Sequence, residues 1–269
     1  MKFWLDSSFA NLLIVKKLLF HKISLVDAKL AYHWGKNGYL ILEEFFNANQ
    51  LDRVWSEYEK ELSNSDRQIK LKNNLPERQL NPHQFSQSIY KLMGNRKLLS
   101  MINFLSGTSN IPFQSISSHR GSEQKAHSDA IHMTTNPLGG LIAAWIAFED
   151  IRGDCGPLEF YPRSHKLPYI LSKDIGIDPG DFDQFGYRDY TEIYEPNIEK
   201  IIKKNKLKKS TFFAKKGDVL LWHHNLLHGG SKITNPSSTR KSLVFHYFSN
   251  DVDCYHDLID KKADLSSFS

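Results

Sequence analysis

The segment QKAHSDAIH, residues 124–132, holds the residue types that a bound metal ion needs. Side chains two positions apart in an extended strand point to the same face, so we expect His127 and Asp129 to project together while Ser128 points away. The pair offers one neutral nitrogen and one anionic oxygen to a single ion. A histidine and an aspartate at this spacing also occur as a hydrogen-bonded pair on a strand surface, and the pair alone does not decide between the two.

A third ligand is available in the segment GDVLLWHHNLLHGG, residues 217–230, which contains His223, His224 and His228. Two histidines and one carboxylate on one face of a metal leave three coordination positions open, an arrangement typical of non-haem Fe(II) oxygenases. The open positions allow the iron to accept a bidentate co-substrate and then O2. The sequence therefore indicates an iron site.

Arg240 is a charged residue in TRKSLVFHYF, a segment that otherwise has the pattern of a buried strand. An arginine is costly to bury without a partner, and its planar guanidinium matches a carboxylate through two parallel hydrogen bonds. A dicarboxylic co-substrate that chelates iron at one end needs such an anchor at the other. Ser242 is expected on the same face and would add a hydroxyl donor. The alternative is a buried ion pair between Arg240 and a carboxylate of the chain.

The composition limits the kind of metal site. The chain has 269 residues with 12 histidines but only 2 cysteines, Cys155 and Cys254. This excludes a disulfide framework and a cysteine-based zinc ribbon, so the ligands must be histidines and carboxylates. The scarcity of cysteine fits a reducing, cytoplasmic compartment. The length is sufficient for a large core without any stabilising metal or disulfide.

Positive charge is concentrated in residues 200–209, KIIKKNKLKK, in a chain whose net charge is +5. Such a run could attract RNA, a membrane surface or an acidic partner. No aromatic residue is interleaved with the lysines and no nucleic-acid-binding motif accompanies them. We therefore favour a solvent-exposed helix or loop face and expect no nucleic-acid partner.

The N-terminal segment is apolar, but Lys16 and Lys17 interrupt it. It lacks the continuous run of about 20 apolar residues that a transmembrane helix needs, so no membrane span is expected. Residues 6–8, DSS, are a plausible helix cap. Apolar residues follow with the spacing of one helix face: Leu12, Val15, Leu19 and Ile23. We expect an amphipathic helix packed on the domain, with a peripheral membrane helix as the alternative.

Helical patterns dominate up to residue 107, and strand patterns follow. We expect a helix over 24–38 that ends at Gly38, a strand over 39–46, a helix over 47–63, a loop over 65–85 and two helices within 88–107. Short apolar segments between turn residues then predict strands over 111–120, 125–135, 140–150, 157–162, 218–224 and 241–249. Several short strands of this kind favour a jelly roll or a sandwich, with residues 167–210 as an insertion.

Taken together, these segments resemble the phytanoyl-CoA dioxygenase family of Fe(II)- and 2-oxoglutarate-dependent oxygenases. The resemblance runs from about Gly38 to His246 and rests on NGYLILEEFFN (37–47), GSEQKAHSDAIHM (121–133), AAWIAFEDIRGDCGPLEFYPRSHK (143–166), GDVLLWHHNLLHGGSKITNPSSTR (217–240) and KSLVFHYFS (241–249). It implies a mainly β protein with flanking helices (α+β), whose double-stranded β-helix, a cupin-like jelly roll, is buttressed by N-terminal helices. We expect a single domain over 1–269, with the helical part in 1–110 and the jelly roll in 111–250.

The resemblance also implies roles for individual residues. The family's iron ligands correspond to His127, Asp129 and His228. Its 2-oxoglutarate pocket corresponds to Arg240, which would hold the distal carboxylate, Trp145, and as weaker candidates Gln124 and Ser242. In related halogenases a small residue replaces the aspartate and makes room for a halide. The presence of Asp129 therefore favours hydroxylation over halogenation.

Several further residues lie in the matched motifs. His132 faces away from His127 in a regular strand, but it would reach the substrate if the strand ended there. Arg163 stands where the family commonly has a small residue, and it would either contact an anionic substrate or point to solvent. His223 and His224 are expected at a strand end or pocket wall. Supporting roles in the turn beside the iron are expected for four residues: Gly156, Pro157, Ser164 and His165.

The expected activity is an Fe(II)- and 2-oxoglutarate-dependent hydroxylation of a small polar or anionic metabolite with O2, releasing succinate and CO2. Residues 65–86 and 167–210 are candidates for selecting that substrate, because both are polar and mixed in charge. One alternative is a cupin-like metal-dependent isomerase or hydrolase, which Arg240 disfavours because such enzymes need no dicarboxylate anchor. Another is a non-catalytic binding protein on the same fold, which the intact triad disfavours.

Overall fold

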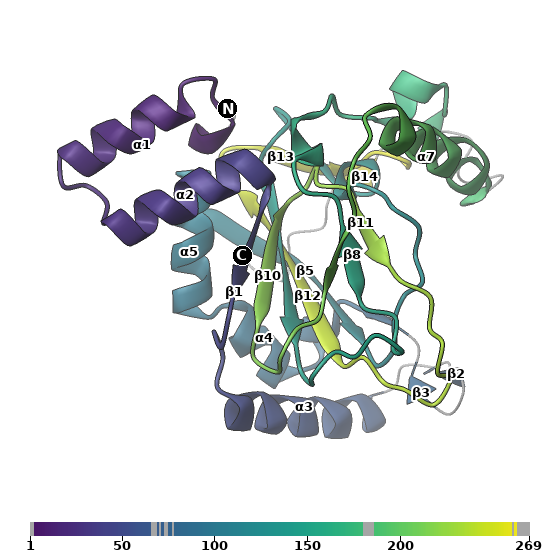
Figure 1. The fold of residues 1–269 in the computed structure, drawn as a ribbon. Helices are drawn as coiled ribbons and strands as arrows, with labels where there is room; N and C mark the ends of the chain where they lie inside the picture. Colours follow the sequence, from purple (N-terminus) through teal and green to yellow (C-terminus); the bar gives the residue numbers. More distant parts are fainter. Residues whose placement is uncertain are drawn as a thin grey trace.

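A six-stranded antiparallel sheet lies at the centre of the computed structural model, which describes residues 3–65, 69, 71–72, 75–76, 78–179, 186–259 and 261–262 (Figure 1). Its strands follow the order β1 (Tyr39–Leu42), β10 (Val219–His223), β7 (Leu141–Ala147), β12 (Ser242–Ser249), β5 (Asn110–Ser118) and β4 (Gln79–Leu80). A three-stranded sheet, β11 (His228–Gly230), β8 (Leu158–Phe160) and β9 (Ser210–Phe212), packs against its inner face. The two sheets form the jelly roll that the sequence predicts.

Two smaller sheets lie outside this pair. One has the order β14 (Lys261–Lys262), β13 (Asp253–His256) and β6 (Thr134–Asn136), and the other pairs β2 (Leu71–Lys72) with β3 (Leu75–Pro76).

The sequence of strand β7, LIAAWIA, is a continuous apolar run. All its residues are buried, because the sheet is covered on both faces. Ile142, Ala144 and Ile146 face the core that the helices cover, whereas Ala143 and Trp145 face the space between the two sheets. Strand β12 follows the same rule, and its inward face is more polar. The inner side of the jelly roll can therefore hold a polar pocket between apolar walls.

Helices cover the outer face of the central sheet, and their ends coincide with capping residues. Ser24 forms a capping box, and Gly38 ends the same helix with a left-handed φ of 79°. Asn47, Ser86 and Asn95 accept hydrogen bonds from the first turns of the next three helices. These helices are α2 (Leu25–Asn37), α3 (Ala48–Ser63), α4 (Gln87–Met93) and α5 (Arg96–Ser106). The predicted helices over 24–38, 47–63 and 88–107 are confirmed.

Other short helical turns connect the strands. They are η2 (Pro82–Gln84), η3 (Asp129–Ile131), η4 (Ser164–Lys166), η5 (Ser172–Ile175) and the π-helical turn η7 (Tyr190–Tyr194), which leads into α7 (Glu195–Lys204). The predicted insertion between strands thus carries helical structure of its own. The lysine run lies at the end of α7 and in the turn after it, and its lysines are exposed, as expected.

The structure corrects the predicted strand over 125–135. His127 makes only an isolated β-bridge, Asp129 begins the 3-10 turn η3, and strand pairing resumes in β6. The predicted strand over 39–46 is also shorter, since β1 ends at Leu42. Part of the predicted loop over 65–85 lies outside the described residues, and the described part includes β2, β3 and β4.

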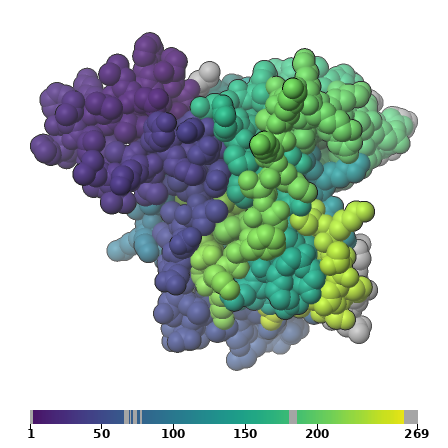
Figure 2. Space-filling model, viewed as in Figure 1, coloured from purple at the N-terminus to yellow at the C-terminus, as the bar shows by residue number. Residues whose placement is uncertain are grey.

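The N-terminal turn η1 (Trp4–Asp6) and helices α1 (Ala10–Leu19) and α2 form a lobe that projects from the sheets (Figures 1 and 2). The predicted helix is present, but its packing face was predicted wrongly. Ala10 and Ile14 are buried, whereas the stripe expected to pack on the domain is exposed: Leu12, Val15 and Leu19. Both faces of α1 are apolar, so the spacing alone did not decide which face packs. Among the described residues, no helix has the length and apolarity needed to cross a membrane.

Candidate metal centre and co-substrate pocket

His127 and His228 are brought together by their own backbones. The two residues form an antiparallel β-bridge in which each N–H donates to the other's carbonyl oxygen across 2.9 Å. Their rings lie 4.5 Å apart, measured between centroids. Gly229 allows this approach, because a Cβ atom there would lie 2.6 Å from the carbonyl oxygen of Gln124. The bridge joins segments that are far apart in the sequence.

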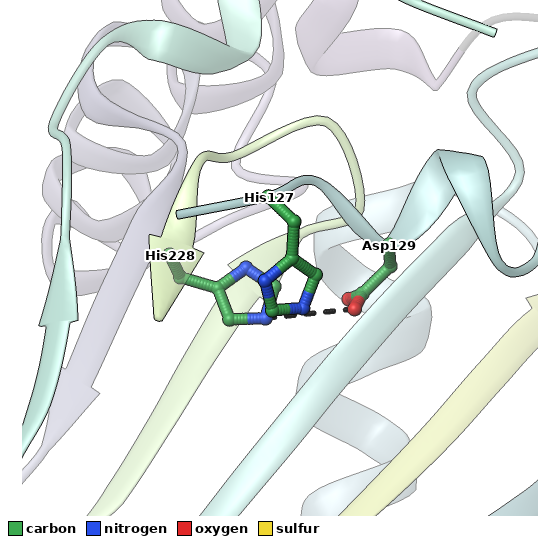
Figure 3. A group of neighbouring side chains, drawn as sticks. All are labelled: His127, Asp129 and His228. Carbon is green, nitrogen blue, oxygen red and sulfur yellow. Dashed lines mark ion pairs between the residues drawn. The ribbon is translucent and has the colours of Figure 1, made fainter. Parts of the chain in front are cut away.

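Asp129 completes the group from the first position of η3 (Figure 3). One ligand atom from each of His127, Asp129 and His228 lies within 4.8 Å of the others, and all three residues are buried. Nε2 of His228 and Oδ1 of Asp129 lie 3.5 Å apart. This cluster could hold an iron ion, with two nitrogen donors and one oxygen donor on one side of it.

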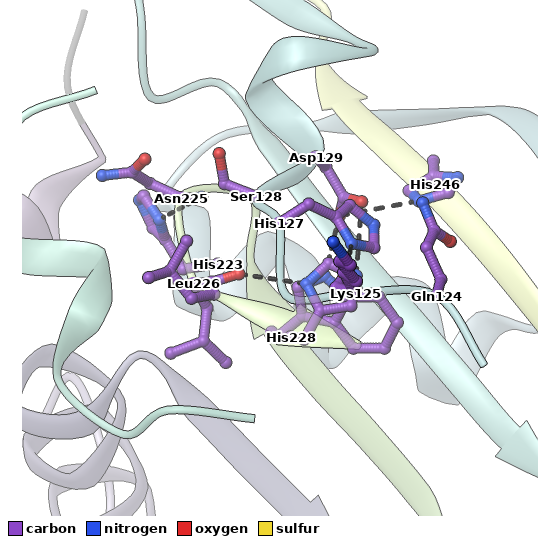
Figure 4. Close-up of polar contacts among 12 residues, drawn as sticks. Gln124, Lys125, His127, Ser128, Asp129, His223, Asn225, Leu226, His228 and His246 are labelled. Carbon is purple, nitrogen blue, oxygen red and sulfur yellow. Dashed lines mark hydrogen bonds and ion pairs between the residues drawn. The ribbon is translucent and has the colours of Figure 1, made fainter. Parts of the chain in front are cut away.

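The two histidine rings are oriented by hydrogen bonds to backbone carbonyls (Figure 4). A carbonyl oxygen only accepts, so Nδ1–H of His127 donates to Lys125 at 2.9 Å and Nδ1–H of His228 donates to Leu226 at 3.0 Å. Both rings therefore carry their proton on Nδ1 and leave Nε2 for a metal. Burial, together with the neighbouring His228 and His132, lowers the pKa of His127 well below its ordinary value, which keeps the ring neutral.

Asp129 is held ionised by its surroundings. Burial alone would raise the pKa of its carboxyl group, but His228 and His246 lower it, and the net pKa lies below the usual range. Trp222 donates its indole N–H to Oδ2 across 2.7 Å, and Nε2 of His246 lies 3.7 Å from the same oxygen. The cluster thus combines a buried carboxylate with two imidazole rings, donor types that a divalent metal takes.

Arg240 lines the same pocket as the three clustered residues, and its charge has no counter-ion. The side chain is buried, its Nη1 donates to the carbonyl of Gly156 at 2.8 Å, and its Nε has no hydrogen-bond partner. Its Cζ atom lies 6.0 Å from the ring centroid of Trp145. No ion pair joins it to a carboxylate of the described residues, so the alternative of a structural ion pair fails there. Burial lowers the pKa of Arg240 to about 10, and the group remains charged at neutral pH.

Of the other residues predicted to bind co-substrate or substrate, three line this pocket and two do not. Trp145, Gln124 and Ser242 line the pocket together with Arg240 and the three clustered residues. His132 packs its ring against that of His127 at 5.6 Å, because η3 ends the expected strand. Arg163 is exposed and lies outside the pocket lining, so the structure places it towards solvent.

Three other histidines of the matched motifs are not among the residues that line this pocket: His165, His223 and His224. His223 packs against Asp6 of the N-terminal turn, with Nε2 and Oδ2 3.3 Å apart, and its ring neighbours those of His165 and His224. His223 is the last residue of β10 and His224 follows it, so both lie at the strand end, as expected. Ser164 Oγ accepts a hydrogen bond from the N–H of Leu227, which supports the turn before His228.

Sequence reasoning missed several residues that surround the cluster. No local pattern in the sequence marks Trp222, His246 or Arg78, and all three line the pocket. Tyr194 of η7 accepts a hydrogen bond from the backbone N–H of Ser128 at 3.0 Å, between two of the clustered residues. These contacts connect residues more than 60 positions apart, so spacing in the sequence carries no trace of them.

Comparisons with known sequences identify a family. The sequence model of the family "Phytanoyl-CoA dioxygenase (PhyH)" matches residues 34–242. The chain is 27% identical over 126 residues to phytanoyl-CoA dioxygenase domain-containing protein 1 of Danio rerio, which covers 47% of this chain and 39% of that protein. The corresponding protein of Mus musculus is 45% identical over 47 residues, or 18% of this chain and 16% of that protein. The matched segments thus span less than half of these relatives.

Solved structures share the fold at low sequence identity. SnoN, a non-haem α-ketoglutarate-dependent epimerase from nogalamycin biosynthesis, superposes with a TM-score of 0.62 at 15% identity, covering 85% of this chain and 84% of its own. EctD from S. alaskensis, crystallised with 2-oxoglutarate and 5-hydroxyectoine, gives 0.63 at 17% identity, with 85% and 77% covered. SnoK, an α-ketoglutarate-dependent carbocyclase, gives 0.63 at 16%, with 88% of each chain covered. These likenesses show the fold, whereas the reactions named for them differ.

Proposed function

The chain belongs to the phytanoyl-CoA dioxygenase family, and we propose from this premise that it is an Fe(II)- and 2-oxoglutarate-dependent hydroxylase of a small polar or anionic molecule. One observation carries the proposal. A buried arginine without a counter-ion, Arg240, lines the same pocket as the cluster of His127, Asp129 and His228. A ligand that combines a metal-chelating end with a distal carboxylate satisfies both features at once.

The three clustered residues are proposed to hold the iron. His127 and His228 present Nε2, since their Nδ1 protons are engaged by carbonyls, and Asp129 presents a carboxylate oxygen. Three protein ligands leave the remaining positions for 2-oxoglutarate and O2. Bound iron would supply the O2 activation that couples conversion of 2-oxoglutarate to succinate and CO2 with insertion of one oxygen atom into a substrate C–H bond.

Arg240 is proposed to bind the distal carboxylate of 2-oxoglutarate. The unpartnered Nε marks the side of the guanidinium that has donor capacity left, and the contact of Nη1 with Gly156 fixes the plane of the group. Trp145 packs beside the guanidinium, and Ser242 lines the same pocket. Arg240 and Trp145 are both buried, and burial strengthens a charged hydrogen bond.

The substrate class is proposed from a second cation, Arg78. This residue is exposed but lines the pocket, which places it at the mouth. It interacts electrostatically with Asp129, Tyr187 and Tyr190, yet it forms no ion pair with a described residue. His132 stacks near Tyr190 at 4.9 Å and adds a neutral polar ring. A substrate with an anionic or strongly polar group fits this mouth better than an uncharged lipid.

The test measures succinate formation by the purified chain with Fe(II), ascorbate, 2-oxoglutarate and a panel of small carboxylates, phosphates and neutral metabolites. With ¹⁸O2, a hydroxylase places one labelled atom in succinate and one in the product. Succinate formation that persists in His127→Ala would contradict the proposed iron ligands. The structural neighbours raise a second outcome, since a product that gains no oxygen would identify an epimerase or a cyclase instead. Absence of 2-oxoglutarate turnover with metal bound would favour a cupin-like isomerase, a hydrolase or a binding protein.

A further inference from the structure

Exposed apolar side chains gather on the N-terminal lobe. Residues 9–26 contain seven of the fourteen large apolar side chains that are exposed in the described part of the chain. We call this set the lobe surface: Phe9, Leu12, Val15, Leu19, Phe20, Leu25 and Val26. The others are scattered over the remaining elements. Single exposed apolar residues are normal on a folded protein. Here half of the exposed large apolar side chains lie on one short helical hairpin, which indicates an interaction site.

Helix α1 shows that the described part of the chain does not cover this surface. Ala10 and Ile14 on one face are buried against the rest of the lobe, whereas Leu12 and Leu19 on the opposite face are 65% and 72% exposed. A helix that is apolar on both faces is normally buried on both. The lobe packs against only one face of α1. We therefore expect another molecule or a membrane to cover the exposed apolar face.

Positive charges prevail around the lobe surface, although Asp27, which forms the capping box with Ser24, follows it directly. Residues 9–26 contain Lys16, Lys17 and Lys22 and no acidic residue. Lys16 and Lys22 are exposed, and Lys17 lies over the ring of Trp4 at 5.0 Å. The turn between α1 and α2 contains Phe20 and Lys22, both of which are exposed. Exposed apolar residues interleaved with lysines are the composition of an element that lies in a membrane interface.

We propose that the lobe surface docks on an anionic phospholipid membrane, with α1 lying in the plane of the interface. Anionic headgroups complement Lys16 and Lys22, while Leu12, Leu19 and Phe20 enter the boundary with the acyl chains. A symmetric pair of these chains would place equal positive charges opposite each other, so a second copy is a poorer occupant. The residues that line the pocket come from other segments of the chain.

The experiment measures co-sedimentation of the full chain with phosphatidylcholine vesicles that contain or lack phosphatidylserine. Binding is expected to the phosphatidylserine vesicles and to weaken with added salt, because surface charge is screened. Replacement of Lys16→Gln and Lys22→Gln together should weaken binding roughly 25-fold, since each surface lysine contributes about fivefold. Replacement of Leu12→Gln and Leu19→Gln together should weaken it at least about tenfold.

Matched controls separate the lobe from other exposed features. Phe213→Gln removes an exposed apolar side chain elsewhere, and Lys203→Gln with Lys204→Gln removes exposed charge from the lysine run on α7. Neither control should change binding. If the lysine run were the membrane contact, the second control would abolish binding and the lobe variants would not, which would overturn the proposal.

A labelled variant gives a readout that does not depend on loss of function. Both natural cysteines are buried, so Leu19→Cys can be labelled selectively with an environment-sensitive dye. Its emission should shift to the blue with phosphatidylserine vesicles, whereas a dye at Phe213→Cys should not respond. The absence of a shift at Leu19→Cys would refute the proposal. So would a concentration-dependent dimer without vesicle binding that the Leu12→Gln and Leu19→Gln replacements abolish, because a second copy would then cover the surface.

Discussion

Trp222 donates its indole N–H to Oδ2 of Asp129 across 2.7 Å, although the two residues are 93 positions apart in the chain. The other oxygen of the carboxylate, Oδ1, faces Nε2 of His228 at 3.5 Å. The hydrogen bond therefore occupies one oxygen and directs the other towards the two histidines. A tryptophan on the inner face of β10 thus sets the orientation of the proposed anionic metal ligand.

Replacing Trp222 with phenylalanine should weaken Fe(II) binding by about 10- to 100-fold, as expected when the group that orients a ligand is lost. The phenyl ring keeps most of the packing but leaves Oδ2 without its donor. Competition calorimetry with Mn(II) or Fe(II) measures the change. Trp34→Phe is the matched control, because Trp34 is equally buried and its indole N–H has no hydrogen-bond partner. Equal metal affinity in the wild type and Trp222→Phe would contradict the orienting role.

Arg240→Met should raise the 2-oxoglutarate concentration needed for half-maximal succinate formation by at least about 30-fold, the cost of removing one partner of a buried charge pair. Metal affinity should change little. The variant removes a buried charge that has no counter-ion, so its thermal unfolding temperature without 2-oxoglutarate should not fall. Arg163→Met, at an exposed position outside the pocket, should leave the 2-oxoglutarate requirement as it is. An unchanged requirement in Arg240→Met would exclude the anchor.

Arg78→Gln should raise the KM for an anionic primary substrate by about tenfold or more, because a hydrogen bond to a charged group is lost. The slow, uncoupled conversion of 2-oxoglutarate without primary substrate should continue at its normal 2-oxoglutarate requirement. Steady-state kinetics with each substrate varied in turn separates the two effects. If the 2-oxoglutarate requirement rises instead, Arg78 contacts the co-substrate and the argument for an anionic substrate loses its support.

Stability should fall on acidification because of buried neutral histidines. Burial lowers the pKa of His165 and of His224 from the ordinary value of 6.5 to about 3. Between these values the unfolded chain binds more protons than the folded one, so the free energy of unfolding decreases as pH falls below about 6.5. Each histidine contributes up to about 1.4 kcal/mol per pH unit to this slope.

Urea unfolding at several pH values between about 6.5 and 5 measures the slope. His224→Gln should make it shallower by roughly one proton, whatever its effect on stability at neutral pH. His21→Asn is the control, because His21 is exposed and asparagine tolerates its positive φ of 52°. A slope that is identical in the wild type and His224→Gln would show that His224 is already protonated in the folded protein.

Much of the fold could be predicted because its signals are local. Ser24 and Gly38 bound a helix through capping and left-handed geometry, which depend on neighbouring residues. The strands of the central sheet were visible as apolar runs. The strand expected around Asp129 was wrong, since a short 3-10 turn leaves no hydrophobic period of its own. The helical spacing of apolar residues in α1 was visible. It did not show which face packs on the protein, because both faces are apolar.

The sequence by itself determined which chemistry is available: two histidines and an aspartate for a metal, an arginine for a carboxylate, and no thiolate site. Only the tertiary structure decided which residues meet. The backbone bridge selects His228 rather than His223 as the neighbour of His127, and Trp222 reaches Asp129 only when β10 packs beside η3. Among the described residues, the elements around Arg240 bring no carboxylate into an ion pair with it. Such contacts depend on how distant segments pack, and the spacing of residues along the chain contains no record of that packing.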